Sequence, residues 1–262
     1  MEPGFRGEVT DFYQRFRRGY PPAVVDHLVE AFALTRDDMA LDIGCGTGQL
    51  TLPLAERVRA AVGLDPEPDM LWRARAAARD RRATNVSWLL GADTDLPALH
   101  ALFGGRRLGA VTIAQALHWM DHGTLFPALA PMIRRNGGVA VVTNGKPLWQ
   151  HDLAWSRALR DVLSGWLGAP LDRTCGTDAA SQQRYREGLA RAGFDVTTAS
   201  VDYSDELSLE QVIGGVYSAL PVDRLPAPER RPDFAARIGR ALQPHRPYVE
   251  DVHVAIVLGT VG

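Results

Sequence analysis

The chain is poor in features that mark nucleic-acid-binding proteins. Lys146 is the only lysine among 29 basic residues, and 31 acids balance those residues to a formal net charge of -2. The arginines are dispersed among acids and alanines and form no block. Binding to a phosphate backbone requires a concentrated basic face, which a near-neutral chain does not supply by default. We therefore expect no nucleic-acid partner.

Cysteine and long apolar runs are also scarce. The only two cysteines are Cys45, in a glycine-rich stretch, and Cys175, in a polar loop. They make neither a disulfide framework nor a metal cluster. No run reaches the ~18 apolar residues of a membrane span, and residues 1–8 carry acids without the apolar core of a secretory signal. We expect a soluble, cytoplasmic protein with no metal and no membrane partner, and the oligomeric state stays open.

Short apolar runs alternate with helical patterns between residues 39 and 143. This alternation predicts a parallel sheet with helices on both faces. The runs predicted as strands are 39–43, 60–64, 86–90, 108–114 and 139–143. Helices are predicted over 49–57, 69–79 and 124–133, and another is predicted after the prolines at 21 and 22.

The pattern changes after residue 144. Apolar residues recur at helical spacing over 159–167, 212–220 and 234–242. Strands are predicted at the end of 193–201 and over 252–258. An α/β chain that gains helices this late commonly uses them to cover the mouth of its site.

A glycine-rich turn follows the first predicted strand. It reads Asp-Ile-Gly-Cys-Gly-Thr-Gly over residues 42–48 and opens the first helix. Glycines allow a tight turn and a close approach of a ligand, and a helix amino end offers N–H groups to a carboxylate or phosphate. The dinucleotide fingerprint has glycine at its first, third and sixth positions, whereas here the third glycine comes fifth and Gln49 is sixth. A dehydrogenase is therefore disfavoured.

The charge of Asp42 narrows the choice of ligand further. A carboxylate at the turn would repel a pyrophosphate and attract an ammonium group. The amino-acid end of S-adenosylmethionine carries both an ammonium and a carboxylate. Asp65 ends the second predicted strand, close to the ~20-residue separation at which an acid binds ribose hydroxyls. An acid in 91–97 can accept a hydrogen bond from adenine, and Pro66 and Met70 can pack on its faces.

These residues resemble class I S-adenosylmethionine-dependent methyltransferases. The resemblance runs from about Tyr13 to Asn144, rests on the 42–48 turn with Asp65, and favours the small-molecule branch with trans-aconitate methyltransferase-like and ubiquinone-biosynthesis methyltransferase-like enzymes. It implies an α/β, Rossmann-like, doubly wound seven-stranded sheet with an antiparallel edge strand. Helical cover would come from the amino-terminal segment and from late insertions.

The resemblance also assigns residues to the cofactor. The turn would bind the methionine part of the cofactor, and Asp65 would bind the ribose. Asp93 would bind the adenine, at a place where relatives often have the sequence Gly-Asp-Ala. Carried over together, the cofactor-binding residues are Tyr13, Tyr20, Asp42, Gly44, Cys45, Gly46, Gly48, Asp65, Pro66, Met70, Ala92, Asp93, Ala114 and Gln115.

The acceptor side is expected around the segment 114–121. His118 is the candidate general base, because neutral imidazole can take a proton near pH 7, and the alternative is that it only lines the pocket. Trp119 and Trp149 are candidate substrate-binding residues together with His118. The implied reaction is methyl transfer to an oxygen or nitrogen of a small, partly apolar metabolite, by analogy in natural-product tailoring.

The resemblance accordingly predicts four parts of the chain. Residues 1–36 form an amino-terminal helical cover, 37–144 the cofactor-binding core, and 145–192 a helical insertion that contributes to the acceptor pocket. Residues 193–262 complete the sheet and contain a helical insertion over 203–250.

Three other functions share the predicted fold. Enzymes that methylate exocyclic base amines often carry Asn/Asp-Pro-Pro-Tyr/Phe after the fourth strand, where this chain reads Ala-Gln-Ala-Leu over 114–117, which disfavours a nucleic-acid methyltransferase. A non-catalytic S-adenosylmethionine-binding module and a cyclase of the same fold both remain open, because binding and turnover use the same cradle.

Overall fold

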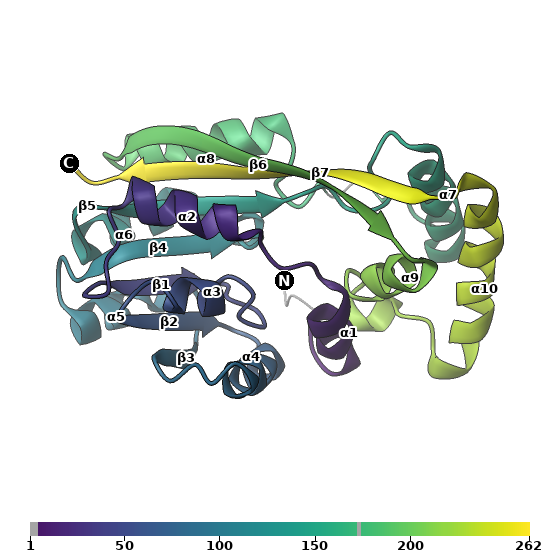
Figure 1. The fold of residues 1–262 in the computed structure, drawn as a ribbon, viewed down its shortest axis with the longest axis horizontal. Coiled ribbons are helices and arrows are strands. Elements are labelled where there is room, and N and C mark those ends of the chain that lie inside the picture. The colour runs from purple at the N-terminus through teal and green to yellow at the C-terminus, as the bar shows by residue number, and fades with distance from the viewer. Residues whose placement is uncertain (1–4, 172–173) are drawn as a thin grey trace. The chain divides into compact units, whose positions relative to one another are not determined.

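A computed structural model describes residues 5–171 and 174–262 of the chain (Figure 1). The first four residues of the predicted amino-terminal cover lie outside these ranges. The chain divides into two compact units, which are described separately. Unit 1 contains Met1–Arg18, Gly145–Cys175 and Asp202–His253, and unit 2 contains Gly19–Asn144, Gly176–Val201 and Val254–Gly262.

The described strands form one seven-stranded sheet in the order β3-β2-β1-β4-β5-β7-β6. Their bounds are β1 Met39–Ile43, β2 Ala60–Asp65, β3 Val86–Leu90, β4 Leu108–Ala114, β5 Ile133–Asn144, β6 Asp195–Leu207 and β7 Tyr248–Thr260. The first five strands pair in parallel, and β7 runs antiparallel to β5. The predicted sheet is confirmed, with one correction. Strand β6 pairs on the outer side of β7, so the antiparallel strand lies one position inside the edge.

Strand β5 is longer than its apolar run predicts. The sequence Arg-Asn-Gly-Gly over 135–138 predicts a turn before the strand, but it lies within β5. The pairing with β4 shifts register there, from Leu108 opposite Ile133 to Ala110 opposite Gly138. Asn136 takes a positive φ of 60°. A local irregularity inside a strand thus uses the same residue types as a connecting turn.

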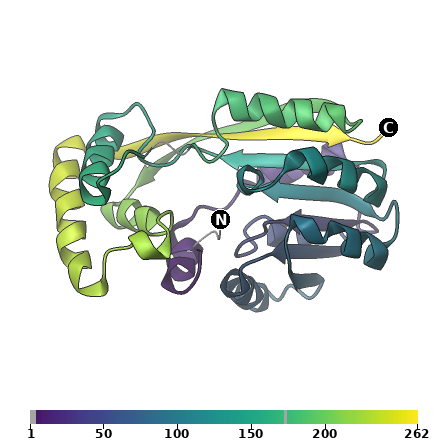
Figure 2. The ribbon, with the colours of Figure 1, turned by 180° about the vertical axis from the view of Figure 1, so that it is seen from behind.

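Helices cover both faces of the sheet in unit 2. They are α2 Pro22–Ala31, α3 Thr51–Ala55, α4 Pro68–Asp80, α5 Leu96–Phe103, α6 His122–Leu129 and α8 Ala179–Arg191. Figures 1 and 2 show α2 and α3 on one face and α5, α6 and α8 on the other. Buried apolar side chains of the second group, including Leu99, Phe126 and Leu189, pack with strand residues such as Val111 and Ile113. Helices on both faces explain why the central strand β4 is almost wholly buried, and the loops at the strand ends are left for polar residues.

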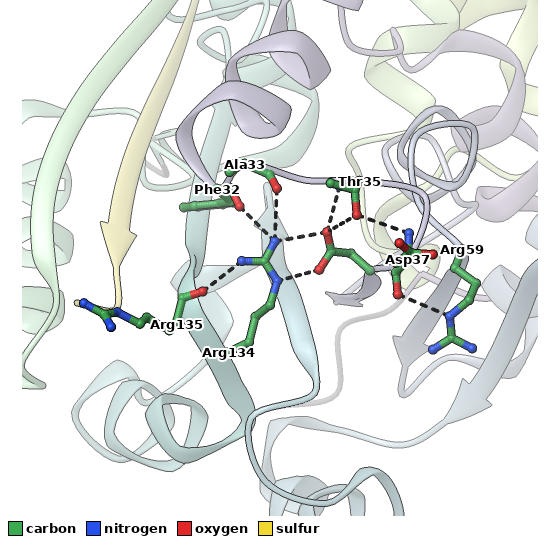
Figure 3. A network of polar contacts seen from close by, with 8 residues as sticks. Phe32, Ala33, Thr35, Asp37, Arg59, Arg134 and Arg135 are labelled. Carbon is green, nitrogen blue, oxygen red and sulfur yellow. Dashed lines mark hydrogen bonds and ion pairs between the residues drawn. The ribbon is translucent and has the colours of Figure 1, made fainter.

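A polar network ties β5 to the residues before β1 (Figure 3). The Arg134 guanidinium donates to both oxygens of Asp38, at 3.0 Å for Oδ2, and to the carbonyls of Phe32 at 3.1 Å and Ala33 at 3.2 Å. Burial raises the pKa of Asp38, but hydrogen bonds from Arg134 and Thr35 outweigh burial and lower it below its ordinary value.

Unit 1 has a separate apolar cluster. Its helices are α1 Glu8–Phe16, α7 Ala154–Leu167, α9 Leu209–Tyr217 and α10 Arg231–Leu242. Phe12 lies 4.9 Å from Tyr217 between ring centroids, and Tyr217 and Trp166 lie 5.8 and 4.7 Å from Phe234. These contacts confirm the apolar faces predicted around 159–167, 212–220 and 234–242. Among the described residues, no helix is long and apolar enough to cross a membrane.

Short 3-10 turns complete the secondary structure. They lie at Asp93–Asp95, Leu117–Trp119, Ala130–Met132, Val222–Arg224, Pro228–Arg230 and Gln243–His245. The first two follow β3 and β4 and therefore stand at the carboxyl edge of the sheet, where the functional residues are predicted.

Candidate cofactor site

The glycine turn after β1 takes a backbone path that side chains would obstruct. Gly44, Gly46 and Gly48 have φ values of 68°, 53° and 81°, in the left-handed region. A β-carbon on Gly44 would stand 2.4 Å from that of Ala116, and one on Gly48 would stand 2.6 Å from the Trp88 ring. The amides of Gly44 and Cys45 both donate to the carbonyl of Leu64, at 2.8 and 3.1 Å. The turn is thus held against the end of β2.

Asp65, at the end of β2, is buried beside this turn. Its Oδ2 accepts the Gly46 N–H at 2.8 Å, and its Oδ1 accepts the Glu67 N–H at 2.9 Å. Burial raises the pKa of Asp65, and the two backbone donors offset part of that effect. A carboxylate has about four acceptor positions, so these two bonds leave capacity on both oxygens for ligand hydroxyls.

Asp42, on β1, is held by two hydroxyl groups. Thr51 at the start of α3 donates to Oδ2 at 2.5 Å, and Thr112 on β4 donates to Oδ1 at 2.7 Å. Burial raises its pKa to about 6, the nearby charge of Asp65 adds to the rise, and the hydroxyl groups reduce it. The two oxygens of Asp42 therefore link β1 to α3 and β4.

Trp88 on β3 is a site residue that the sequence patterns did not single out. Its ring lies under the turn, because a β-carbon on Gly63 would stand 2.6 Å from that ring and 2.8 Å from the Cys45 sulfur. Glycine at positions 48 and 63 leaves the space that the indole fills. Burial raises the pKa of the Cys45 thiol well above its ordinary value, and the charges of Asp65 and Asp42 add to this.

The acids after β3 differ in their contacts. Asp95 Oδ2 accepts the Ala92 N–H at 2.8 Å and so closes the turn that begins at Ala92. Asp93, the residue predicted to face adenine, is half-buried at the start of the 3-10 turn. Met70 on α4 is buried, and Pro66 is exposed.

The loop after β4 carries the predicted acceptor-side residues. Ala114 ends the strand, and Gln115 takes a φ of 53° while its amide donates to the Val142 carbonyl at 2.9 Å. His118 and Trp119 lie on one 3-10 turn with ring centroids 5.0 Å apart, and Trp119 is 41% exposed. Because β1 to β4 are parallel, these residues share a sheet edge with the glycine turn and Asp65.

Two predicted residues belong to unit 1 and are not brought to this edge by the sheet. Tyr13 is half-buried on α1, 6.0 Å from Phe5 between ring centroids, and Trp149 is 7% exposed. Their roles stay predictions. Tyr20 belongs to unit 2 and is half-buried. Within the described ranges, no group of three or more His, Cys, Asp or Glu residues is arranged to hold a metal ion.

Comparison with known proteins places this site in context. Residues 40–137 match the family described as a methyltransferase domain. An uncharacterised methyltransferase of Mycobacterium tuberculosis is 34% identical over 157 residues, which are 60% of this chain and 58% of that protein. The similarity thus spans less than two thirds of the relative's length.

Solved structures extend the likeness over most of the fold. A putative type II methyltransferase from Anaeromyxobacter dehalogenans covers 94% of this chain and 98% of its own, with a TM-score of 0.63 and 23% identity. Geranyl diphosphate C-methyltransferase from Streptomyces coelicolor, in complex with Mg²⁺, geranyl diphosphate and S-adenosyl-L-homocysteine, covers 91% and 78%, with a TM-score of 0.50 and 15% identity. Likenesses at this identity concern the fold alone.

Proposed function

Because this chain carries a methyltransferase domain of the class I S-adenosylmethionine-dependent family over residues 40–137, we propose that it transfers a methyl group from that cofactor to a small molecule. The acceptor atom in this proposal is an oxygen or nitrogen of a partly apolar metabolite. The observation that carries the proposal is the left-handed glycine turn with the buried carboxylates of Asp42 and Asp65 beside it.

The chemistry of these residues suits a cationic amino-acid nucleoside. When bound, S-adenosylmethionine supplies a methyl group on a positively charged sulfur and an ammonium group. Two buried carboxylates favour such a cation. Burial is the main cause of the raised pKa of both Asp42 and Asp65, and the charge of Asp65 adds to the rise at Asp42. Thr47 is 1% exposed, and its hydroxyl group has no hydrogen-bond partner among the described residues, so it offers a further polar contact in the turn.

Within the proposal, each sheet-edge residue has one task. The 42–48 turn holds the amino-acid end, and Asp65 accepts from the ribose hydroxyls. Ala92 and Asp93 meet the adenine edge, while Pro66 and Met70 pack on its faces. Gln115, whose buried Oε1 has no partner in the described part of the chain, would take a hydrogen bond from the cofactor. Tyr13 and Tyr20 would cover it.

The acceptor would be positioned by the loop after β4. His118 lies on the short 3-10 turn that follows β4, where a base could accept a proton from an acceptor hydroxyl group. Trp119, with its exposed ring, would provide an apolar wall, and Trp149 a second one. Because the sulfonium already activates the methyl group, holding the nucleophile at ~3 to 3.5 Å and excluding water would supply most of the rate.

The parts of the chain then have distinct proposed roles. Residues 37–144 bind the cofactor, 1–36 cover it, and 145–192 with 203–250 shape the acceptor pocket. A metabolite is the proposed partner, because the dispersed arginines provide no basic face for a nucleic acid.

Calorimetric titration with S-adenosylmethionine and S-adenosylhomocysteine tests the cofactor, with NADH as the competing nucleotide. We expect both adenosyl ligands to bind and NADH not to bind. Incubation with methyl-labelled cofactor and a panel of hydroxyl- and amine-bearing metabolites then tests transfer. Binding without any labelled product would favour a non-catalytic module, and uptake of NADH alone would refute the proposal.

A further inference from the structure

Unit 1 contains a buried charged cluster that the proposed cofactor site does not use. It consists of Arg18, His151 and Glu250, and we call it the Arg-His-Glu cluster. Arg18 Nη2 donates to Glu250 Oε1, and His151 Nε2 lies 3.4 Å from Glu250 Oε2. The Glu250 side chain is 0% exposed and that of His151 9% exposed. Arg18 and Glu250, which are 232 residues apart in the chain, therefore form a contact in the folded protein.

The cluster has unused hydrogen-bonding capacity. Within the described residues, Arg18 Nη1, His151 Nε2 and Glu250 Oε2 are buried and have no hydrogen-bond partner. The last two are close enough for an ion pair, but they are not aligned for a hydrogen bond. Trp149, two residues before His151, adds a buried indole N–H without a partner. Folded proteins satisfy nearly all buried polar groups, so these unpaired atoms require an explanation.

Backbone contacts hold the cluster in place. Ser156 Oγ accepts the His151 N–H at 3.0 Å and donates to the Leu148 carbonyl at 2.7 Å. Trp155 Nε1 donates to the Val249 carbonyl at 2.9 Å, next to Glu250. The unpaired atoms are therefore presented by ordered segments, as expected for a binding site organised in advance.

The charges select the kind of group that would satisfy these atoms. The Arg18 guanidinium and the Glu250 carboxylate compensate each other, so an added anion would face Glu250 and an added cation would face Arg18. A neutral group that both accepts and donates suits both. A hydroxyl group accepts from Arg18 Nη1 and donates to Glu250 or His151.

The side chains around the cluster favour a ligand in which the hydroxyl group is attached to an aromatic ring. The His151 ring is stacked on Trp155 with centroids 6.1 Å apart, and the Trp155 and Tyr248 rings lie 6.3 Å apart. Both rings belong to a buried apolar cluster that also contains Trp149. The Arg18 side chain is 24% exposed, so one member of the cluster reaches solvent.

We propose that the Arg-His-Glu cluster binds the hydroxyl group of a small phenolic ligand. The binding itself is independent of the methyltransferase activity.

The test uses three probes with the same ring. These are 4-methylphenol, 4-methylanisole, which lacks the O–H donor, and 4-methylbenzoate, which is an anion. Binding to the full-length protein is measured by calorimetry and ligand-observed NMR without cofactor. We expect 4-methylphenol to bind with a Kd of about 1 mM or tighter, as suits a fragment of this size, and the other two to bind at least about tenfold more weakly.

Variants assign the binding to the cluster. His151→Phe keeps a planar ring beside Trp155 and removes both nitrogens, and Glu250→Gln removes the carboxylate charge. Asp152→Asn is the matched control, because Asp152 is the next residue along the chain and its side chain is 99% exposed. We expect His151→Phe to weaken 4-methylphenol binding by about tenfold or more while the thermal midpoint stays near that of the control. If Glu250→Gln fails to fold, His151→Phe alone decides.

Three outcomes would overturn the proposal. Equal binding of 4-methylphenol and 4-methylanisole would remove the hydroxyl contact, and stronger binding of 4-methylbenzoate would make the site an anion site. Absence of 4-methylphenol binding up to about 10 mM in the folded protein would mean that only water satisfies the cluster. These results leave S-adenosylmethionine binding untouched. Conversely, a protein that binds the phenol but no adenosyl ligand would refute the proposed function and leave the cluster's role intact.

Discussion

Replacing Asp42 by asparagine is expected to stabilise the protein at neutral pH and weaken cofactor binding. Asparagine has the same shape and can still hydrogen-bond the hydroxyls of Thr51 and Thr112. The substitution removes the Asp42 carboxyl group, whose pKa is raised from 3.8 to about 6 by burial and by the charge of Asp65. A rise of this size corresponds to about 3 kcal/mol of unfolding free energy once the carboxyl is ionised in both states.

The sign of the pH dependence follows from the direction of the pKa change. Because the folded state holds the Asp42 proton more tightly than the unfolded state, the native protein is favoured at low pH. That contribution is fully present below pH ~4 and is lost as the pH rises through about 6. The Asn variant has no carboxyl group at position 42, so it is not destabilised by ionisation there as the pH rises. Its stability relative to the native protein should therefore grow over this window and then level off.

Urea unfolding between about pH 4 and pH 8 measures the difference, since each midpoint and slope yields an unfolding free energy. Asp37→Asn is the matched control, because it removes the same charge from a residue that is exposed in the loop before β1. Calorimetry at neutral pH should find S-adenosylmethionine binding weakened by about tenfold or more, since an ammonium group loses an attracting charge. A variant that is less stable than the native protein at neutral pH, with unchanged cofactor affinity, would refute the electrostatic role of Asp42.

Three further predictions concern other residues. Asp65→Ala should abolish measurable binding of S-adenosylmethionine in calorimetry, because the acceptor for the ribose hydroxyls is lost; tight binding by this variant would contradict the assignment. His118→Ala should lower kcat by ~10² or more with nearly intact cofactor affinity, as expected on removal of a general base, and an unchanged rate would leave His118 as pocket lining. Arg134→Met should lower the unfolding free energy by about 2 kcal/mol at neutral pH by leaving the Asp38 carboxylate unpaired. Since Asp38 has a lowered pKa, that difference in urea unfolding should shrink as the pH falls below about 4, and a pH-independent difference would argue against the ion pair.

The fold and the family were predictable because their signals are local. Each apolar run of the core is bounded by turn residues, and the strand bounds predicted at 39–43, 86–90 and 108–114 match the structure. The class I S-adenosylmethionine-dependent methyltransferase resemblance is confirmed by the domain match over 40–137 and by the sheet order. The short helix α3 and the internal irregularity of β5 were less predictable, because turn-forming residues serve both inside and between elements.

The candidate site was predictable only in part, because only some of its residues carry a local signal in the sequence. Asp42 stands out because it adjoins the glycine turn, and Asp65 because it ends the next strand, about 20 residues after that turn. Their surroundings do not stand out. A threonine at 112 or a tryptophan at 88 has no distinctive spacing from the turn, and only the parallel pairing of β1 to β4 brings them beneath it.

The amino-acid sequence by itself determined the alternation of strands and helices, the glycine turn and the two acids, because backbone preferences and side-chain periodicity act over a few neighbouring residues. Tertiary structure alone decided the charge environment. Asp42 meets Thr112 across 70 residues, and Arg18 meets Glu250 across 232. Desolvation and pairing depend on what surrounds a group in space, and no local pattern in a chain records those neighbours.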